Sequence, residues 1–464
     1  MSRTKEASQR ISIPYVDEAA TVLTYNDGYT VVLVPKKGDV FNISTWVRTG
    51  SIHEDERLNG VSHFLEHLLF KGTQRFGPGE FDHIMESMGA IINAATWKDF
   101  TFYYVTGPTD KQNENFDLAL DMHADMMINS TIPDGEVGPP YDPASDYTGE
   151  KRERSVVIEE IGMREDQPFT KIYNSVNHMM YPEGHPYRRD VIGTRKIIGL
   201  IPRQDIVDYY HRWYSPQNLV TIVVGDFTPE ELEAKVLKSF NFGQSALSNG
   251  HKIEPGKAIT QAPSTQLPPP KLAEVPGEYQ TCFFIMALHG PDPKNLRETI
   301  ALDVASHALG EGRSSRRNQE LVEKPATPVF NFVSCGQSTY KLGNAFYVQG
   351  NFNTPEGQTP QQVLQQVSEQ IKLLTTTKPV TQAEFNRAVK KLKVQFAEAS
   401  ETVSGIAENI GESLTVVGNL SHYTEYLSTL ETLDLETVNA VAKKYLKLDA
   451  MYQSVMVPST ESNN

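Results

Sequence analysis

Apolar residues near the N-terminus follow strand-like patterns. The stretches 20–37, "ATVLTYNDGYTVVLVPKK", and 40–51, "VFNISTWVRTGS", are rich in β-branched residues. The Asn-Asp-Gly at 26–28 separates two apolar runs and predicts a β-hairpin. The β-branched and aromatic residues of 89–108 predict a second pair of strands. We therefore expect a mostly antiparallel sheet in this part of the chain.

Helical stretches alternate with these strands. Residues 60–73, "GVSHFLEHLLFKGT", predict a helix, and a longer one is expected from about Lys151. Residues 203–226 predict a helix followed by a buried strand, whereas 132–150 are rich in Gly, Pro and Asp and predict an exposed loop. The segment 113–130 suits a helix packed on a sheet. Its apolar residues are Phe116, Leu118, Leu120, Met122, Met126 and Met127.

The order of elements recurs in the second half of the chain. Residues 344–371 repeat the pattern of 100–127, and residues 434–458 repeat the helix, aromatic residue and strand of 203–226. Between the halves, residues 245–272 are poor in apolar residues and dense in Pro, Ser and Gly, which predicts a linker. We expect an α+β protein of two similar domains, residues 1–244 and 273–464, each a mostly antiparallel sheet covered by helices.

Length and charge limit the classes of function. A chain of 464 residues is too long for one ordinary core and suggests several domains. Its 58 carboxylates outnumber 43 basic groups and give a formal charge of −15, which argues against a nucleic-acid partner. The acidic balance either serves solubility or marks a cavity that attracts basic peptides.

The compartment can also be predicted. Cys282 and Cys335 cannot form a disulfide framework, so a reducing compartment is expected. The N-terminal residues lack the apolar core of a secretory signal, and no apolar run approaches the 18 residues of a membrane span. We expect a bacterial cytoplasmic protein with no membrane span, with a periplasmic or organellar location as the alternative.

Two histidines and a glutamate stand inside the apolar run at 60–73. Four residues make about one helical turn, so His63 and His67 can point both imidazoles at one metal ion. Glu66 lies beside this pair and is placed to take a proton from a metal-bound water. The alternative is a pair of core histidines that donate to backbone carbonyls.

A catalytic zinc site needs three protein ligands and one open position. The helix at 150–166, "EKRERSVVIEEIGMRED", offers candidates for the third. Glu153 and Glu160 are seven residues apart and share one face, so Glu160 could bind the ion while Glu153 holds a histidine N–H. Glu159 is the alternative ligand, and a solvated charged face is the alternative for the whole helix.

The pair of motifs resembles a known family. "HFLEH" followed by a distant "ERSVVIEE" is similar to the inverted-motif zinc peptidases, the pitrilysin and insulinase family with the mitochondrial processing peptidase. The resemblance covers nearly the whole chain, including "ESMGAIINAATWKDFTFYYV" and "EGHPYRRDVIGT". At this length it is nearest to the short branch, in which two chains close around a chamber and each forms half of a clamshell.

The resemblance implies a zinc metalloendopeptidase with one Zn²⁺ per chain. It assigns His63, His67 and Glu160 as ligands, Glu66 as the general base and Glu153 as the supporting glutamate of the catalytic site. The separation between His67 and Glu160 is longer than usual for the family, and the loop at 132–150 accounts for the excess.

The substrate is expected to be a peptide. The stretch "INAATWKDFTFYY" resembles the family's substrate-binding edge strand, which makes Asn93 and Ala94 candidates for substrate contact. The alternative is an ordinary buried hairpin.

The family's second half usually supplies an arginine and a tyrosine seven residues apart. The matching positions here hold Val322 and Val329, and we expect Arg316 and Arg317 to face elsewhere. This departure implies that the chain is the zinc-bearing subunit of a heterodimer, whose homologous partner subunit supplies the Arg/Tyr pair.

Two other functions stay open at this point. One is a non-catalytic structural subunit of the same family, although such members have lost metal ligands that this chain keeps. The other is a dedicated maturation protease for one small peptide, which the sequence does not distinguish from a peptidase of broader range.

Overall fold

The structure, a computed structural model, describes residues 3–144, 149–242, 256, 257, 259, 267–310, 312–325 and 328–459. Its residues form two compact units, each assembled from three segments of the chain. The first unit comprises Met1–Ile161, Arg189–Ile259 and Ala397–Thr424, and the second Gly162–Arg188, Thr260–Phe396 and Glu425–Asn464. Most of the expected linker at 245–272 lies outside the described residues, and the domain boundaries at 244 and 273 stay predictions.

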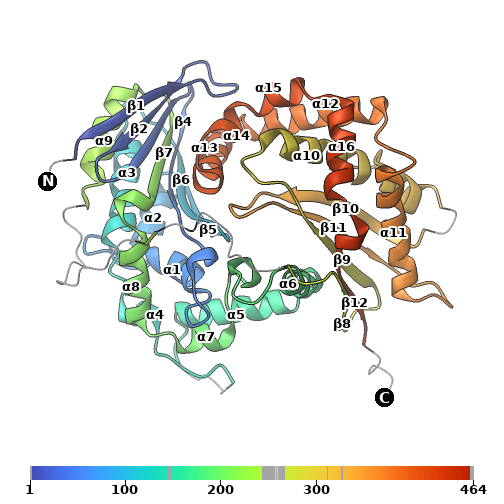
Figure 1. The fold of residues 1–464 in the computed structure, drawn as a ribbon. Helices are drawn as coiled ribbons and strands as arrows, with labels where there is room; N and C mark the ends of the chain where they lie inside the picture. The colour runs from blue at the N-terminus through green and yellow to red at the C-terminus, as the bar shows by residue number, and fades with distance from the viewer. Residues whose placement is uncertain are drawn as a thin grey trace. The chain divides into compact units, whose positions relative to one another are not determined.

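A seven-stranded sheet organises the first unit, in the order β1-β2-β3-β7-β4-β6-β5 (Figure 1). The strands are β1 Lys5–Ile11, β2 Ala20–Tyr25, β3 Thr30–Pro35, β4 Val40–Val47, β5 Ile91–Thr96, β6 Thr101–Pro108 and β7 Leu219–Gly225. Neighbouring strands are antiparallel except β3 and β7, which are parallel. The hairpins predicted at 20–37 and 89–108 are confirmed as β2–β3 and β5–β6.

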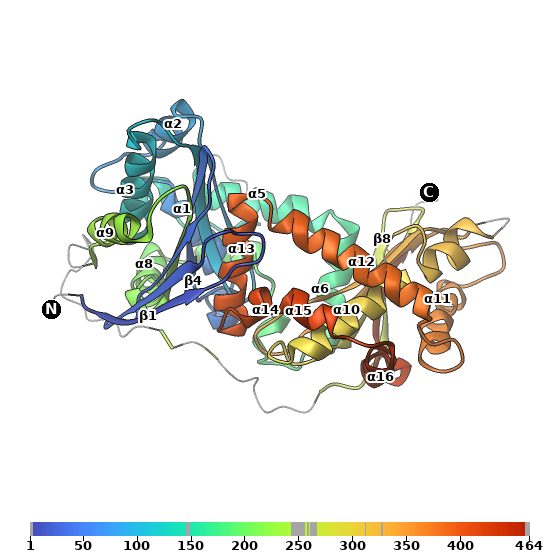
Figure 2. The same ribbon diagram turned by 90° about the horizontal axis from the view of Figure 1, so that it is seen from above.

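Helices cover both faces of this sheet. The helices that begin in the first unit are α1 Val61–Leu69, α2 Glu80–Ser87, α3 Glu114–Asn129, α4 Asp134–Val137, α5 Glu153–Glu165, α7 Arg195–Leu200, α8 Arg203–Trp213, α9 Pro229–Ser239, α13 Val403–Glu412 and α14 Ser421–Thr424, with the 3-10 turns η1 Ser51–His53 and η3 Pro216–Asn218 and the π-helix η6 Ser413–Val417. On one face α1, α3, α8 and α9 enclose the larger core. On the other face α13 packs on β4 and β7 (Figure 2).

The double covering explains why β7 is apolar except for Thr221. Every residue of Leu219–Gly225 is buried. Leu219 and Val223 face the larger core, while Trp46 of β4 on the opposite face meets Gly411 of α13, where a Cβ would come within 2.0 Å of the indole. A strand buried on both faces needs no polar alternation.

The loop expected at 132–150 is more structured than its composition indicated. Residues 134–137 form the short helix α4, and Val137 is buried in the core. Asp134 and Gly135 are exposed as expected, but these residues are helical rather than loop, and the apolar Val137 fills a place in the core. Residues 145–148 lie outside the part of the chain that the structure describes.

The second unit repeats the plan of the first. Its sheet runs β10-β11-β9-β12-β8, with β8 Leu272–Gly277, β9 Cys282–His289, β10 Phe330–Ser338, β11 Ala345–Phe352 and β12 Tyr452–Pro458. The first sheet has the same order, β5-β6-β4-β7-β3, and continues with two further strands, β2 and β1, beyond β3. The parallel pair of the second sheet, β12 and β8, occupies the positions equivalent to those of the parallel pair β7 and β3 in the first sheet. The α+β class with two similar halves is confirmed.

The helices of the second unit complete the repeat. They are α6 Pro168–Met180, α10 Leu296–Gly310, α11 Pro360–Thr375, α12 Gln382–Ala399, α15 Tyr426–Glu431 and α16 Leu435–Tyr445, with the short segments η2 Pro186–Arg188, η5 Asn318–Glu323 and η7 Leu448–Ala450. Helix α11 follows β11 as α3 follows β6, and α16 precedes β12 as α8 precedes β7. None of the helices described is long and apolar enough to cross a membrane.

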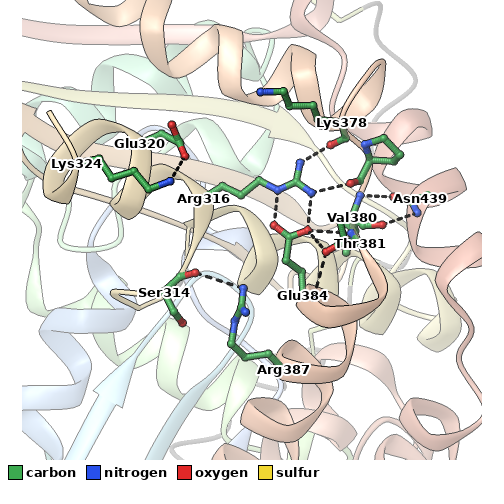
Figure 3. Close-up of polar contacts among 11 residues, drawn as sticks. Ser314, Arg316, Glu320, Lys324, Lys378, Val380, Thr381, Glu384, Arg387 and Asn439 are labelled. Atoms are coloured by element: carbon green, nitrogen blue, oxygen red, sulfur yellow. Dashed lines mark hydrogen bonds and ion pairs between the residues drawn. The ribbon is translucent and has the colours of Figure 1, made fainter.

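Arg316 holds together three segments of the second unit (Figure 3). Its guanidinium donates to the Glu384 carboxylate and to the carbonyls of Lys378 and Pro379. Glu384 also accepts from the backbone N–H and hydroxyl of Thr381, at 2.8 and 2.7 Å. Burial raises the pKa of Glu384, but these hydrogen bonds outweigh it and lower the pKa to about 2. The guanidinium of Arg316 thus has a structural role in the second unit.

This ion pair should make stability depend on acid. A carboxyl whose pKa is lower in the folded state stabilises the protein above its unfolded pKa, near 4.5, and loses that contribution as the pH falls toward 2. Between pH 5 and pH 3 the free energy of unfolding should drop by about 2 kcal/mol through Glu384 alone. Urea unfolding of wild type and Glu384→Gln at both pH values measures the difference.

The variant Glu369→Gln is the matched control, since Glu369 forms only an exposed pair with Lys372. It should follow the wild-type pH dependence, while Glu384→Gln should show a flatter one. Equal slopes for Glu384→Gln and wild type would show that Arg316 does not stabilise the ionised carboxyl.

Candidate metal centre

Helix α1 is fixed at its N-terminus by a buried carboxylate. Glu54 accepts hydrogen bonds from the backbone N–H groups of Gly60 and Ser62, at 2.8 and 2.9 Å, and from the Asn59 amide at 2.9 Å. Its oxygens satisfy free N–H groups of the first turn. Burial raises the pKa of Glu54 above its usual value, and these hydrogen bonds oppose that shift. Gly60 has φ +95°, and a Cβ on it would meet the Ile192 carbonyl at 2.6 Å. The start of α1 is therefore fixed by both hydrogen bonds and close packing.

The two histidines project from one face of α1. Their ring centroids are 4.8 Å apart, as expected for residues one turn apart. The rest of the helix is anchored in the core by Phe64, Leu65 and Leu68, which are fully buried. These apolar contacts fix the rotation of the helix and hence the direction of both imidazoles.

Helix α5 brings a carboxylate to the same point. Glu160 Oε2 lies 3.6 Å from His63 Nε2 and 3.5 Å from His67 Nε2. The ligand atoms of the three residues all lie within 4.8 Å of one another. Within the described residues no other group of three or more His, Cys, Asp or Glu side chains converges in this way. Glu159 points elsewhere and pairs with Lys151 at 2.8 Å.

The donor set fits a zinc ion. Ligand atoms about 2.0–2.1 Å from a tetrahedral ion are about 3.4 Å from one another. The two measured nitrogen–oxygen separations, 3.5 and 3.6 Å, are close to that value. Two imidazoles with one carboxylate are a ligand combination of catalytic zinc sites, which leave one position open.

A second glutamate of α5 orients the far side of the His67 ring. Glu153 Oε2 lies 3.2 Å from His67 Nδ1, and Glu153 Oε1 lies 2.8 Å from the Lys71 ammonium. Burial raises the pKa of Glu153, but the hydrogen bonds from His67 and Lys71 outweigh it and leave the pKa below its usual value. An ionised Glu153 holds the proton on Nδ1 and leaves Nε2 directed at Glu160.

The carboxylates around His67 make the site attract positive charge. Burial alone would lower the pKa of His67, yet hydrogen bonds to Glu153 and Glu160, together with the charge of Glu66, raise the pKa to about 9. The same negative groups that favour a proton favour a metal cation.

A buried arginine, which the sequence did not indicate, fixes α5. Arg154 is 1% exposed and donates to four carbonyls, those of Gly138, Ile198, Gly199 and Ile201. Its guanidinium also lies 5.4 Å from the ring of Phe64 in α1. Charged residues are rarely buried, so an arginine next to Glu153 would be expected on the helix surface, and the sequence alone does not predict its burial. Arg154 ties the helix of the glutamates to the helix of the histidines.

The two candidate substrate residues lie on the outermost strand of the first sheet. Strand β5 pairs with β6 and ends the sheet. Asn93 is exposed, whereas Ala94 points to the opposite face and packs against the core. Glu66 of α1 is the candidate general base. Its carboxylate accepts a hydrogen bond at 2.5 Å from the hydroxyl of Thr96, which belongs to β5.

The valines at the expected donor positions belong to the second unit. Val322 and Val329 are partly buried and pack against its core. Neither side chain can donate a hydrogen bond. Arg317 is fully buried, and Arg316 is bound to Glu384.

Comparisons with known proteins identify the family of the chain. A family model described as insulinase (peptidase family M16) matches residues 30–181, and one described as peptidase M16 inactive domain matches residues 201–392. All of the metal-ligand candidates fall within the first match. The word "inactive" therefore attaches to the part of the chain that lacks them.

Individual relatives extend over most of the chain. An uncharacterized zinc protease of Bacillus subtilis, YmxG, is 27% identical over 410 residues, 88% of this chain and 90% of that one. The mitochondrial-processing peptidase subunit beta of Mus musculus is 26% identical over 409 residues, 87% of this chain and 77% of that one. A crystal structure of a protease from Helicobacter pylori has the same fold, with a TM-score of 0.80 at 24% identity over 98% of this chain and 100% of that chain.

Removal of the Glu153 carboxylate should loosen the metal site without unfolding it. Loss of a carboxylate that holds a ligating histidine typically weakens metal binding by about 10–100-fold. Glu153→Ala should show this loss in a zinc competition titration against a fluorescent chelator. Glu159→Ala, an exposed glutamate of the same helix, is the matched control and should bind zinc like wild type. Equal zinc affinity in both variants would mean that Glu153 does not orient His67.

Proposed function

Since the chain belongs to the insulinase family of peptidases, M16, we propose that it is a zinc metalloendopeptidase. The observation that carries the proposal is the convergence of His63, His67 and Glu160 on one point, with Glu66 on the same helix. The names of the relatives, which are called zinc proteases or a processing peptidase subunit, support the same chemistry.

The proposed reaction is hydrolysis of a peptide bond. A zinc ion held by His63, His67 and Glu160 would lower the pKa of a bound water and polarise the scissile carbonyl. Glu66 takes the proton of the attacking water and passes it to the leaving amine. Glu153 keeps the His67 ring in place during both steps, and Lys71 keeps Glu153 in place.

We place the substrate on the free edge of β5. An extended peptide can add to an outermost strand through backbone hydrogen bonds, which gives loose sequence preference. Asn93 and Ala94 would contact it, one from each face of the strand. The net charge of −15 favours basic peptides.

The chain is proposed to act as the zinc-bearing subunit of a heterodimer. Val322 and Val329 cannot stabilise an oxyanion, so a homologous partner subunit with an arginine and a tyrosine would supply those donors. The likeness to a processing peptidase subunit supports this assembly. Full turnover by the purified chain without a partner would overturn it. The bacterial cytoplasm stays our prediction for the compartment.

A structural subunit of the same family is the competing function. The three convergent donors and Glu66 favour an enzyme, because a scaffold has no use for them. A maturation protease for one small peptide would use the same site, and the two differ only in substrate range.

Replacement of Glu66 by glutamine should separate catalysis from metal binding. Loss of a general base typically costs about 10²–10⁴-fold in rate. Glu66→Gln should keep one zinc per chain, by elemental analysis, and lose peptidase activity by at least the lower of these factors. The assay follows cleavage of a quenched fluorescent basic peptide by the chain together with its homologous partner.

Glu86→Gln, an exposed residue of α2, is the control and should retain full activity. A Glu66→Gln variant that turns over like wild type would contradict the assignment of the base. A wild-type protein that binds zinc but cleaves no peptide would favour the structural subunit.

A further inference from the structure

The side chain of Thr96 links the outermost strand of the first sheet to helix α1. Thr96 is the last residue of β5, and its hydroxyl donates to Glu66 Oε2 at 2.5 Å. It is 9% exposed, whereas Ile91 at the other end of the strand is 64% exposed. The contact therefore lies in a partly buried position next to the candidate metal centre.

The alternation of β5 explains why Thr96 faces α1. Side chains two residues apart share a face of a strand, so Ile92, Ala94 and Thr96 point the same way. Ile92 and Ala94 pack against the larger core, and α1 packs directly on β5. A polar side chain on this face can therefore contact α1. Thr96, the third residue of the series, contacts Glu66.

The sheet holds the Thr96 hydroxyl in place. Thr96 is opposite Thr101 in the register of β5 and β6, and Thr101 in turn donates to the carbonyl of Thr49 at 3.1 Å. Immediately after Thr96 the chain turns, closed by the hydrogen bond from Trp97 N–H to the Phe100 carbonyl at 2.8 Å. A β-branched side chain has few rotamers, so a fixed backbone fixes the hydroxyl as well.

A glutamate carboxylate without such a contact has a poorly defined orientation. Its last torsion is broad and nearly two-fold, so the two oxygens can sweep through many positions. A hydrogen bond from a hydroxyl to an ionised carboxylate is short and strong, and it selects one orientation. The hydroxyl of Thr96 therefore helps to fix the direction in which the oxygens of Glu66 point.

We propose that Thr96 is the positioning residue of the general base Glu66, and that it links this base to the strand that receives the substrate. The inference rests on the proposed peptidase function and deepens it. Thr96 is not a metal-ligand candidate and, in our assignment, does not act on the scissile bond. It acts through Glu66, so its removal should slow the chemical step more than it weakens substrate binding.

Removal of the hydroxyl tests the proposal kinetically. Thr96→Val keeps the shape of the side chain and should lower kcat by about 10–100-fold, the usual effect of a misplaced catalytic group. KM should change by less than about twofold, and the zinc content should stay at one per chain. Thr96→Ser restores the hydroxyl and should recover most of kcat.

Thr106→Val is the matched control, because it removes a hydroxyl from the other end of β6, where that hydroxyl pairs with Asn42 and Ser404. It should leave kcat near that of wild type. If Thr96→Val keeps the wild-type kcat, or if Thr96→Ser is as slow as Thr96→Val, the proposal is wrong.

A second measurement, of stability, does not depend on peptidase activity. A double-mutant cycle of Thr96→Val and Glu66→Ala on the metal-free chain reports whether the two side chains interact. Urea unfolding should show that Thr96→Val changes the folding equilibrium constant about tenfold more when Glu66 is present than when it is alanine. Strictly additive effects would overturn the contact.

The two tests separate this inference from the proposed function. If the wild-type protein cleaves no peptide, the proposed function fails, while the cycle still decides the contact between Thr96 and Glu66. If the wild-type protein is active and the Thr96 variants behave like it, only the inference fails.

Discussion

The convergence of two imidazoles and one carboxylate is the constraint on which the rest of this protein depends. Three ligand atoms that lie within 4.8 Å of one another must be contributed by two helices whose sequences are about ninety residues apart. Such proximity of buried and partly buried polar groups is costly unless something compensates it, whether a proton, hydrogen bonds or a metal cation. The surrounding structure works to keep the groups together in spite of that cost.

Two buried polar anchors do most of this work. Glu54 fixes the start of α1 by accepting three hydrogen bonds, and Arg154 fixes α5 by donating to four carbonyls. Arg154 makes all four of these hydrogen bonds to backbone carbonyls, and Glu54 accepts two of its three from backbone N–H groups. Because backbone groups of the folded chain have little freedom to move, these hydrogen bonds fix the position of α1 relative to α5. Lys71 and Glu153 then orient the His67 ring within that frame.

Much of this arrangement could be predicted from the sequence, because it follows from local periodicity. The spacing of His63 and His67 places them on one helical face, and the seven-residue spacing of Glu153 and Glu160 does the same. The hairpins and the repeated order of elements follow from β-branched runs and turn residues. Each of these features depends on residues close in the sequence.

The features that escaped prediction depend on residues far apart. Trp46 gives no sign that α13, more than 350 residues later, covers its face of the sheet. Arg154 reads as an ordinary helix-surface residue until the carbonyls of 138 and 198–201 are brought to it. Thr96 reads as an ordinary strand residue until α1 lies across β5. Charge, size and periodicity give no information on such long-range partners.

X-ray absorption at the zinc edge of the purified full-length protein tests the central claim most directly. We expect one zinc per chain, with two imidazole nitrogens and one or two oxygens at about 2.0–2.1 Å and no sulfur ligand. Replacement of Glu160 by alanine should remove one oxygen from the shell or empty it. A protein that takes up no zinc, or a shell that holds sulfur or a single imidazole, would contradict the account.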